Sequence, residues 1–111
     1  MRSIKYPAIY NHFKNKYYAV MTVSKPLNDE KIKEDSIILE GYHTEINKFI
    51  KIYKVGDLYY HEEKINDNLV LYKALYDDKG IYARPIEMFL SEVDKDKYPD
   101  IEQKYRFELV N

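Results

Sequence analysis

The sequence contains no cysteine and no tryptophan, and it has only three glycines in 111 residues. The absence of cysteine excludes disulfides, cysteine-ligated zinc, iron–sulfur clusters and a thiol nucleophile. Gly41, Gly56 and Gly80 stand alone, so there is no glycine-rich loop to cradle a phosphate. No serine lies in a glycine-flanked turn of the kind that carries a serine nucleophile. These absences favour a protein that is not an enzyme, and we predict no cofactor.

An excess of one charge and long apolar runs are also missing. The 18 basic and 19 acidic side chains leave a formal charge of −1, which gives no general attraction to nucleic acid or membranes. No run approaches the roughly 18 apolar residues of a membrane helix, and the first residues lack the apolar region of a signal peptide. We therefore predict a cytoplasmic protein without membrane contacts, and we disfavour nucleic acid as a partner.

Aromatic and β-branched residues are abundant, with thirteen tyrosines, and they gather in short runs separated by turn residues. Pro85 suits the first position of a helix, and the charged segment 27–35 suits a loop or one helical turn. The runs predict strands over 16–23, 36–42, 48–55, 58–61, 69–76, 81–84 and 104–110. This pattern predicts a single mainly β domain over 1–111, a small barrel or curled sheet with one short helical segment over 85–92. We expect one core, formed by Tyr72, Ala74, Leu75, Ile81, Phe89 and Phe107.

Three motifs carry a resemblance to a known family. Residues 72–76 read Tyr-Lys-Ala-Leu-Tyr, and residues 84–89 read Arg-Pro-Ile-Glu-Met-Phe. They resemble the Tyr-Arg-Ala-Leu-Tyr and Arg-Pro-Leu-Glu-Met-Phe pattern of a bacterial and phage family, the domain of unknown function numbered sixteen-fifty-three. Residues 10–16 resemble its opening Tyr-Arg-His-Phe-Lys-Gly motif, and residues 105–108 resemble its closing Arg-Phe motif. The resemblance implies an SH3-like β-barrel and carries no known activity.

The sequence departs from the family pattern in three places. Lys73 replaces an arginine, and Tyr82 stands where the family has tryptophan. The segment 24–60 lies where members pass almost directly from one motif to the next, so we interpret it as an insertion. Its apolar content predicts a β-hairpin added at the barrel edge. An unpaired edge favours association with another chain, so we expect a homodimer.

Arg84 is the most informative candidate for a binding residue, because it ends a strand immediately before a proline-started helix. One interpretation is an ion pair with Glu87 that fixes this corner. The other is a guanidinium presented to a carboxylate or phosphate, which its planar fork suits. If the domain has a functional surface, we expect Arg84 at its centre, with Lys14, Tyr82, Glu87, Arg106 and His12 nearby.

Several functions remain open. The first hypothesis is a non-catalytic protein- or peptide-interaction module whose inserted hairpin selects the partner. The second is a pocket for a nucleotide or another small anionic ligand, with Arg84, Lys14 and Arg106 as its cations. Nucleic-acid binding is a weaker third, and an enzyme comes last. The histidines lack the spacing of metal ligands, so we predict no metal site.

Overall fold

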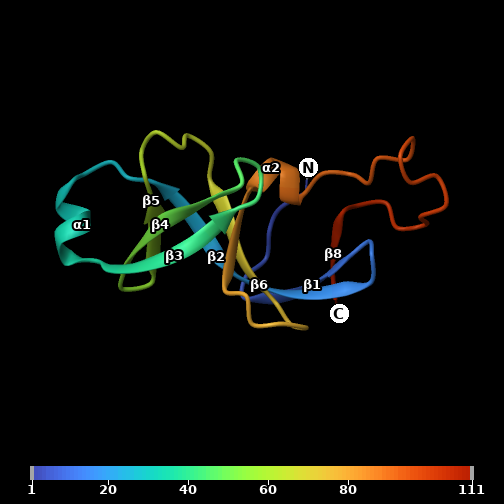
Figure 1. Cartoon of the computed structure of the whole chain (residues 1–111), viewed down its shortest axis with the longest axis horizontal. Helices are drawn as coiled ribbons and strands as arrows, with labels where there is room; N and C mark the ends of the chain where they lie inside the picture. The colour runs from blue at the N-terminus through green and yellow to red at the C-terminus, as the bar shows by residue number, and fades with distance from the viewer. Residues whose placement is uncertain (1, 111) are drawn as a thin grey trace.

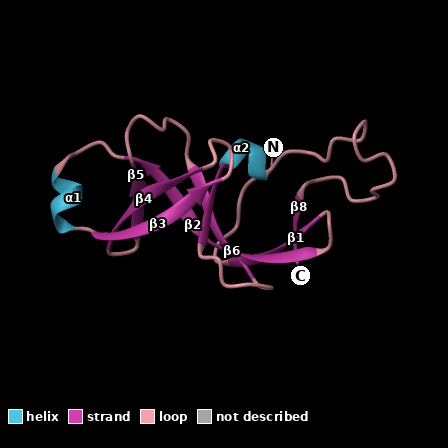
Figure 2. Cartoon of the chain, viewed as in Figure 1, coloured by secondary structure: helices cyan, strands magenta, loops and turns pink. Residues whose placement is uncertain are grey.

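The computed structural model describes residues 2–110, which form eight strands and two short helices (Figure 1). The strands are β1 (Ala8–His12), β2 (Lys16–Pro26), β3 (Ile37–His43), β4 (Lys48–Val55), β5 (Leu58–His61), β6 (Leu69–Ala74), β7 (Ile81–Pro85) and β8 (Phe107–Leu109). The helices are α1 (Lys31–Asp35) and α2 (Ile86–Phe89). Strands dominate, and the irregular segment between α2 and β8 extends to one end of the molecule (Figure 2). The fold is therefore mainly β, as predicted, with two short helices where one was expected.

The sheet closes into a small barrel. Its strand order is β5-β4-β3-β7-β6-β2-β1-β8, and a further pairing of β5 with β2 closes six of these strands on themselves. The long strand β2 makes this possible. Its first half pairs with β1, its last residues pair with β5, and a register shift near Val20 lies between the two parts. Strands β1 and β8 therefore continue the sheet beyond the barrel.

The segment 24–60 does not lie at an edge, so that part of the prediction is wrong. It supplies β3, β4 and most of β5, and β4 pairs with β3 on one side and with β5 on the other. Strand β3 pairs in parallel with β7, which joins this segment to the strands of the family-like motifs. The segment thus completes the barrel wall, and the unpaired edge on which the homodimer expectation rested is not there.

Strand β6 separates two apolar clusters. Successive side chains of a strand point to opposite faces, so Val70 and Tyr72 enter one cluster while Leu69 and Leu71 enter the other. The first cluster holds Tyr10, Val20, Val70, Tyr72, Phe89 and Phe107, and the second holds Ile52, Leu69, Leu71 and Ala83. The expectation of a single core is therefore wrong.

Two of the predicted core residues lie elsewhere. Leu75 follows the end of β6 and is 54% exposed. Ile81 is partly buried and packs on the second cluster. The other four are buried. Phe89 brings α2 into the first cluster, because its ring stacks on Phe107 with the ring centroids 4.0 Å apart.

Candidate functional site

Arg84 lies on β7, and its side chain is held along one side only. Its Nε donates a hydrogen bond of 3.0 Å to the hydroxyl of Tyr72, and its guanidinium carbon lies 5.7 Å from the ring centroid of Phe107. Within residues 2–110 it makes no other hydrogen bond and no salt bridge. The neighbouring strand therefore orients the guanidinium while its terminal nitrogens remain free to bind a ligand.

A small cavity of about 130 Å³, here called the arginine cavity, adjoins this guanidinium. It is lined by Tyr18, Thr44, Tyr72, Tyr82 and Arg84. The Thr44 hydroxyl oxygen is buried, and no partner for it exists in the described part of the chain. A buried polar atom without a partner is costly and rare. Among residues 2–110 no carboxylate lines the cavity, so the polar side-chain groups of this lining are one guanidinium and four hydroxyls.

The tyrosines of this cavity remain hydrogen-bond donors at neutral pH. Burial raises the pKa of Tyr72, although the nearby Arg84 charge opposes the shift. Burial also raises the pKa of Tyr82. The pKa of Tyr18 is raised first by burial and then by its 2.7 Å hydrogen bond with the Tyr76 hydroxyl. The cavity therefore offers protonated phenols beside a permanent positive charge.

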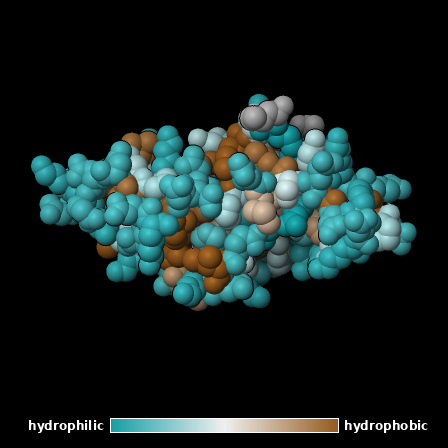
Figure 3. Space-filling model, turned by 90° about the horizontal axis from the view of Figure 1, so that it is seen from above, coloured by the Kyte–Doolittle hydropathy of each residue, from teal (hydrophilic) through white to brown (hydrophobic). Residues whose placement is uncertain are grey.

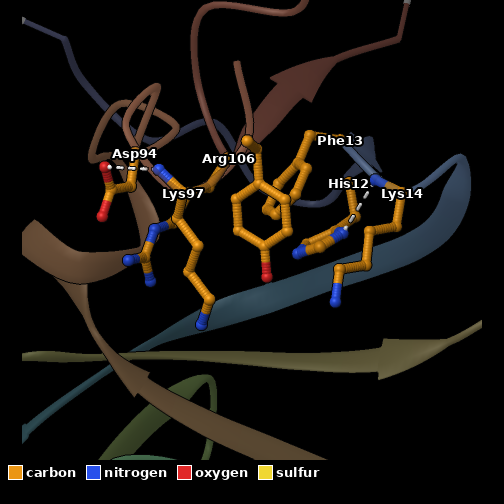
Figure 4. Close-up of a pocket in the computed structure, with 7 residues that line it drawn as sticks. His12, Phe13, Lys14, Asp94, Lys97 and Arg106 are labelled. Atoms are coloured by element: carbon orange, nitrogen blue, oxygen red, sulfur yellow. Dashed lines mark hydrogen bonds between the residues drawn. The ribbon is translucent and has the colours of Figure 1, made fainter. Parts of the chain in front are cut away.

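A second, larger cavity of about 290 Å³ contains more basic residues; we call it the basic cavity. It is lined by His12, Phe13, Lys14, Asp94, Lys97, Tyr98 and Arg106 (Figure 4). A hydrogen bond of 2.9 Å from the Phe13 amide to the Arg106 carbonyl ties the β1–β2 turn to the segment before β8. Figure 4 shows the side chains of His12, Lys14 and Lys97 extending to the same side.

The cations of the basic cavity are not neutralised by salt bridges within residues 2–110. Asp94 is the one carboxylate that the described residues place in the lining. Its oxygen accepts hydrogen bonds from the backbone amides of Asp96 and Lys97. The Lys14 ammonium lies 5.8 Å from the Phe13 ring centroid and 5.5 Å from that of Tyr98. Three cations thus face one carboxylate on a partly aromatic surface.

His12 lines the basic cavity and lies near the arginine cavity, with its ring centroid 6.2 Å from that of Tyr18. Its ring lies edge-on to Phe107, with the centroids 4.9 Å apart, and Arg84 lies over the same Phe107 ring. Burial lowers the pKa of His12 to about 4, and four positive charges add to the effect. These belong to Arg84, Lys14, Arg106 and Lys16.

The neutral His12 ring has a defined tautomer. The backbone amide of Lys14 donates a hydrogen bond of 3.1 Å to its Nδ1, so the ring proton is on Nε2. His12 is therefore an uncharged hydrogen-bond donor at pH 7, in a region with several positive charges.

Five of the six residues predicted for the site lie in the two cavities. Arg84 and Tyr82 line the arginine cavity, while Lys14, Arg106 and His12 line the basic cavity.

Glu87 does not lie with them. It is exposed on α2, in a separate cavity of about 640 Å³ that also involves Ile86 and Leu90. Figure 3 looks onto the side of the molecule that carries α2, and apolar side chains gather over its middle. The structure therefore gives no support to the interpretation in which Arg84 pairs with Glu87. Tyr72 is the partner of Arg84 instead.

Sequence reasoning missed several residues of the site, among them Tyr72, Thr44 and Lys97. Tyr72 was expected only in the core, although it belongs to a family-like motif. Thr44 follows β3, and its amide donates a hydrogen bond of 3.0 Å to the Ala83 carbonyl, so its place depends on the parallel pairing of β3 with β7. No sequence signal indicated that pairing. Lys97 lies in an irregular segment, and no pattern marks it.

The structure also bears on metal binding and on membrane-spanning helices. Over the part of the chain that is described, no three histidine, aspartate or glutamate side chains gather closely enough to hold a metal ion. Neither helix is long and apolar enough to cross a membrane.

Comparison with known proteins identifies a family but no characterised relative. Residues 50–109, more than half of the chain, match the family model described as "Protein of unknown function (DUF1653)". The match includes Tyr72, Tyr82, Arg84 and Arg106, whereas His12 and Lys14 precede it. No curated protein and no solved structure matches the chain. The chain therefore belongs to the DUF1653 family of proteins of unknown function.

Proposed function

We propose that this domain is a non-catalytic module that binds a small anionic ligand across the arginine cavity and the basic cavity. The observation that carries the proposal is the state of Arg84. Its guanidinium is oriented through one nitrogen by Tyr72, and its terminal nitrogens have no partner within residues 2–110. An arginine held in this way presents the two parallel N–H groups that bind a carboxylate or phosphate.

The surrounding charges support the proposal. Lys14, Lys97 and Arg106 line the adjoining cavity without salt bridges to the described carboxylates. After burial, the charges of Arg84, Lys14 and Arg106 are among the causes that lower the pKa of His12. Gathering positive charges is unfavourable unless an opposite charge offsets their repulsion. A bound anion would supply that charge.

The other hypotheses have less support. A protein partner at the 24–60 hairpin was the first hypothesis from the sequence, but the hairpin is part of the closed barrel wall.

Catalysis needs an activated nucleophile or a base placed near a reacting group. Within residues 2–110, His12 is the one base in either cavity whose pKa is lowered, and no serine or cysteine lines the two cavities.

Calorimetric titration and thermal unfolding with phosphate, sulfate and citrate, at constant ionic strength, test the proposal. At ten times the dissociation constant, a ligand stabilises the folded state by about 1.4 kcal/mol, which raises the melting temperature by about 5 °C. Arg84→Lys keeps the charge but removes the fork, so we expect at least about tenfold weaker binding. Arg106→Gln should also weaken it.

Lys25→Gln is the matched control, because it removes one positive charge from an exposed part of β2 outside both cavities. Its affinity should equal that of the unmodified protein. Equal affinities for Arg84→Lys and Lys25→Gln, or no anion-dependent stabilisation at all, would show that Arg84 does not form an anion site.

A further inference from the structure

The hydrogen-bond donors of the arginine cavity indicate what kind of anion it takes. An arginine has five N–H groups, and Arg84 uses the one on Nε with Tyr72. The Tyr72 hydroxyl accepts that bond, and its own proton has no acceptor within residues 2–110. The hydroxyl of Tyr82 likewise has no partner there, and neither has that of Thr44. The cavity therefore offers the free end of a guanidinium and three hydroxyl protons.

These donors outnumber the oxygens of a carboxylate. A carboxylate has two oxygens, and the end of a guanidinium fork occupies both in a bidentate pair. The three hydroxyls would then compete for the remaining lone pairs. A phosphate monoester presents three terminal oxygens and a charge between −1.5 and −2 at neutral pH. Its third oxygen gives the hydroxyls of Thr44, Tyr72 and Tyr82 an acceptor that a carboxylate lacks.

The dimensions of the two cavities suit a small ester. The arginine cavity, at about 130 Å³, has room for about four water molecules, each of which takes about 30 Å³ of liquid. It accommodates the anionic group but not the body of a ligand. The adjoining basic cavity, at about 290 Å³, is close to the lower end of the range for small-molecule sites.

From these observations we infer that the domain binds the phosphate monoester of a small molecule, with the phosphate in the arginine cavity and the organic part in the basic cavity. The inference rests on the proposed function and narrows it to one ligand class. A phosphodiester has two terminal oxygens and a single charge, so a nucleic-acid backbone suits these donors less well.

The test compares probes by calorimetry at pH 7.5 and constant ionic strength. The probes are inorganic phosphate, ribose 5-phosphate, adenosine monophosphate, acetate, succinate and a single-stranded oligonucleotide without terminal phosphates. We expect the phosphate compounds to bind at least about tenfold more tightly than the carboxylates and the oligonucleotide. If the ligand is free phosphate, inorganic phosphate and the esters should bind with equal affinity. If the ligand is an ester, the esters should bind more tightly than inorganic phosphate, and Lys97→Gln should reduce this difference.

Two conservative substitutions locate the phosphate. Thr44→Val keeps the shape of the side chain and removes a hydroxyl that bonds to nothing in the described chain, so the melting temperature should not fall. Tyr82→Phe also removes one hydroxyl. Each should weaken phosphate binding about tenfold, because a hydrogen bond to a charged group is lost. Tyr59→Phe on β5, outside both cavities, is the control and should leave the affinity unchanged.

The possible results separate the inference from the proposed function. Carboxylates that bind as tightly as phosphate, with Arg84→Lys still impaired, would overturn the monoester inference and leave the anion site standing. An oligonucleotide that binds as tightly as the monoesters would also overturn the monoester inference and leave the anion site standing. Phosphate binding that is unaffected by Thr44→Val and Tyr82→Phe would overturn the assignment to the arginine cavity. If no probe binds, both proposals are wrong.

Discussion

His12 should make the stability of the folded domain depend on pH in the acidic range. Its pKa is about 4 in the folded protein, against 6.5 for an unperturbed histidine. The unfolded chain therefore binds the proton more tightly, so stability falls as the pH falls. The contribution of neutral His12 is complete above pH 6.5 and is lost on the way down to about pH 4.

The magnitude follows from the same two pKa values. At 1.36 kcal/mol per pH unit, the full difference sets an upper bound of about 3.4 kcal/mol. The ring is partly accessible to solvent, and salt screens the charges that act on it. We therefore expect His12 to account for about 1–2 kcal/mol of the stability lost between pH 7 and pH 5.

Urea unfolding at pH 7, 6 and 5 measures this effect, with His12→Asn as the comparison. An asparagine side chain also accepts the Lys14 amide hydrogen bond that His12 Nδ1 accepts, and it does not titrate. Burial lowers the pKa values of His43 and His61 as well, so both proteins should lose stability in acid. The unmodified protein should lose about 1–2 kcal/mol more. Parallel curves for the two proteins would refute the reasoning.

Three further predictions concern the fold. Phe89→Ala should lower the free energy of unfolding by about 3–5 kcal/mol, measured in urea, because this buried ring stacks on Phe107; a loss under about 1 kcal/mol would contradict its place in the core. Ser24→Ala should cost about 1–3 kcal/mol, because it leaves the buried His61 Nδ1 without its 2.7 Å partner, and an unchanged stability would argue against that bond. Amides of β4 should exchange slowly with deuterium, because the strand is paired on both sides; rapid exchange through residues 49–55 would show that this part of the barrel wall opens.

Much of the barrel could be predicted from local sequence patterns. Strands β4 and β5 have the predicted bounds, because their apolar runs flank a clear turn at Gly56 and Asp57. Strand β1 was missed. It contains Asn11 and His12, and it is stabilised by pairing with β2 and with β8, which is distant in the sequence. Closure of the barrel by β2 and β5 likewise depends on a long-range pairing that no local pattern indicates.

The candidate site, like the fold, could be predicted only in part from the sequence. Arg84, Arg106 and Lys14 belong to family-like motifs, so they could be predicted as site residues from the sequence. Thr44 and Lys97 could not be predicted, because the position of Thr44 depends on the β3–β7 pairing and Lys97 lies in an irregular segment. Glu87 was placed wrongly beside Arg84, because the direction of a single helical turn cannot be deduced from its sequence alone.

The most direct test of the account is to observe the Arg84 side chain during a phosphate titration, by NMR of the ¹⁵N-labelled protein at constant ionic strength. We predict saturable shifts of the Arg84 and Arg106 Nε–H signals and of the His12 ring, all with one dissociation constant. Arg2 is the internal control, because its terminal nitrogens donate to the carbonyls of Leu90 and Phe107, and its signal should stay constant. Shifts that do not saturate, equal shifts at all three arginines, or an unmoved Arg84 signal would contradict the proposal that this guanidinium binds an anion.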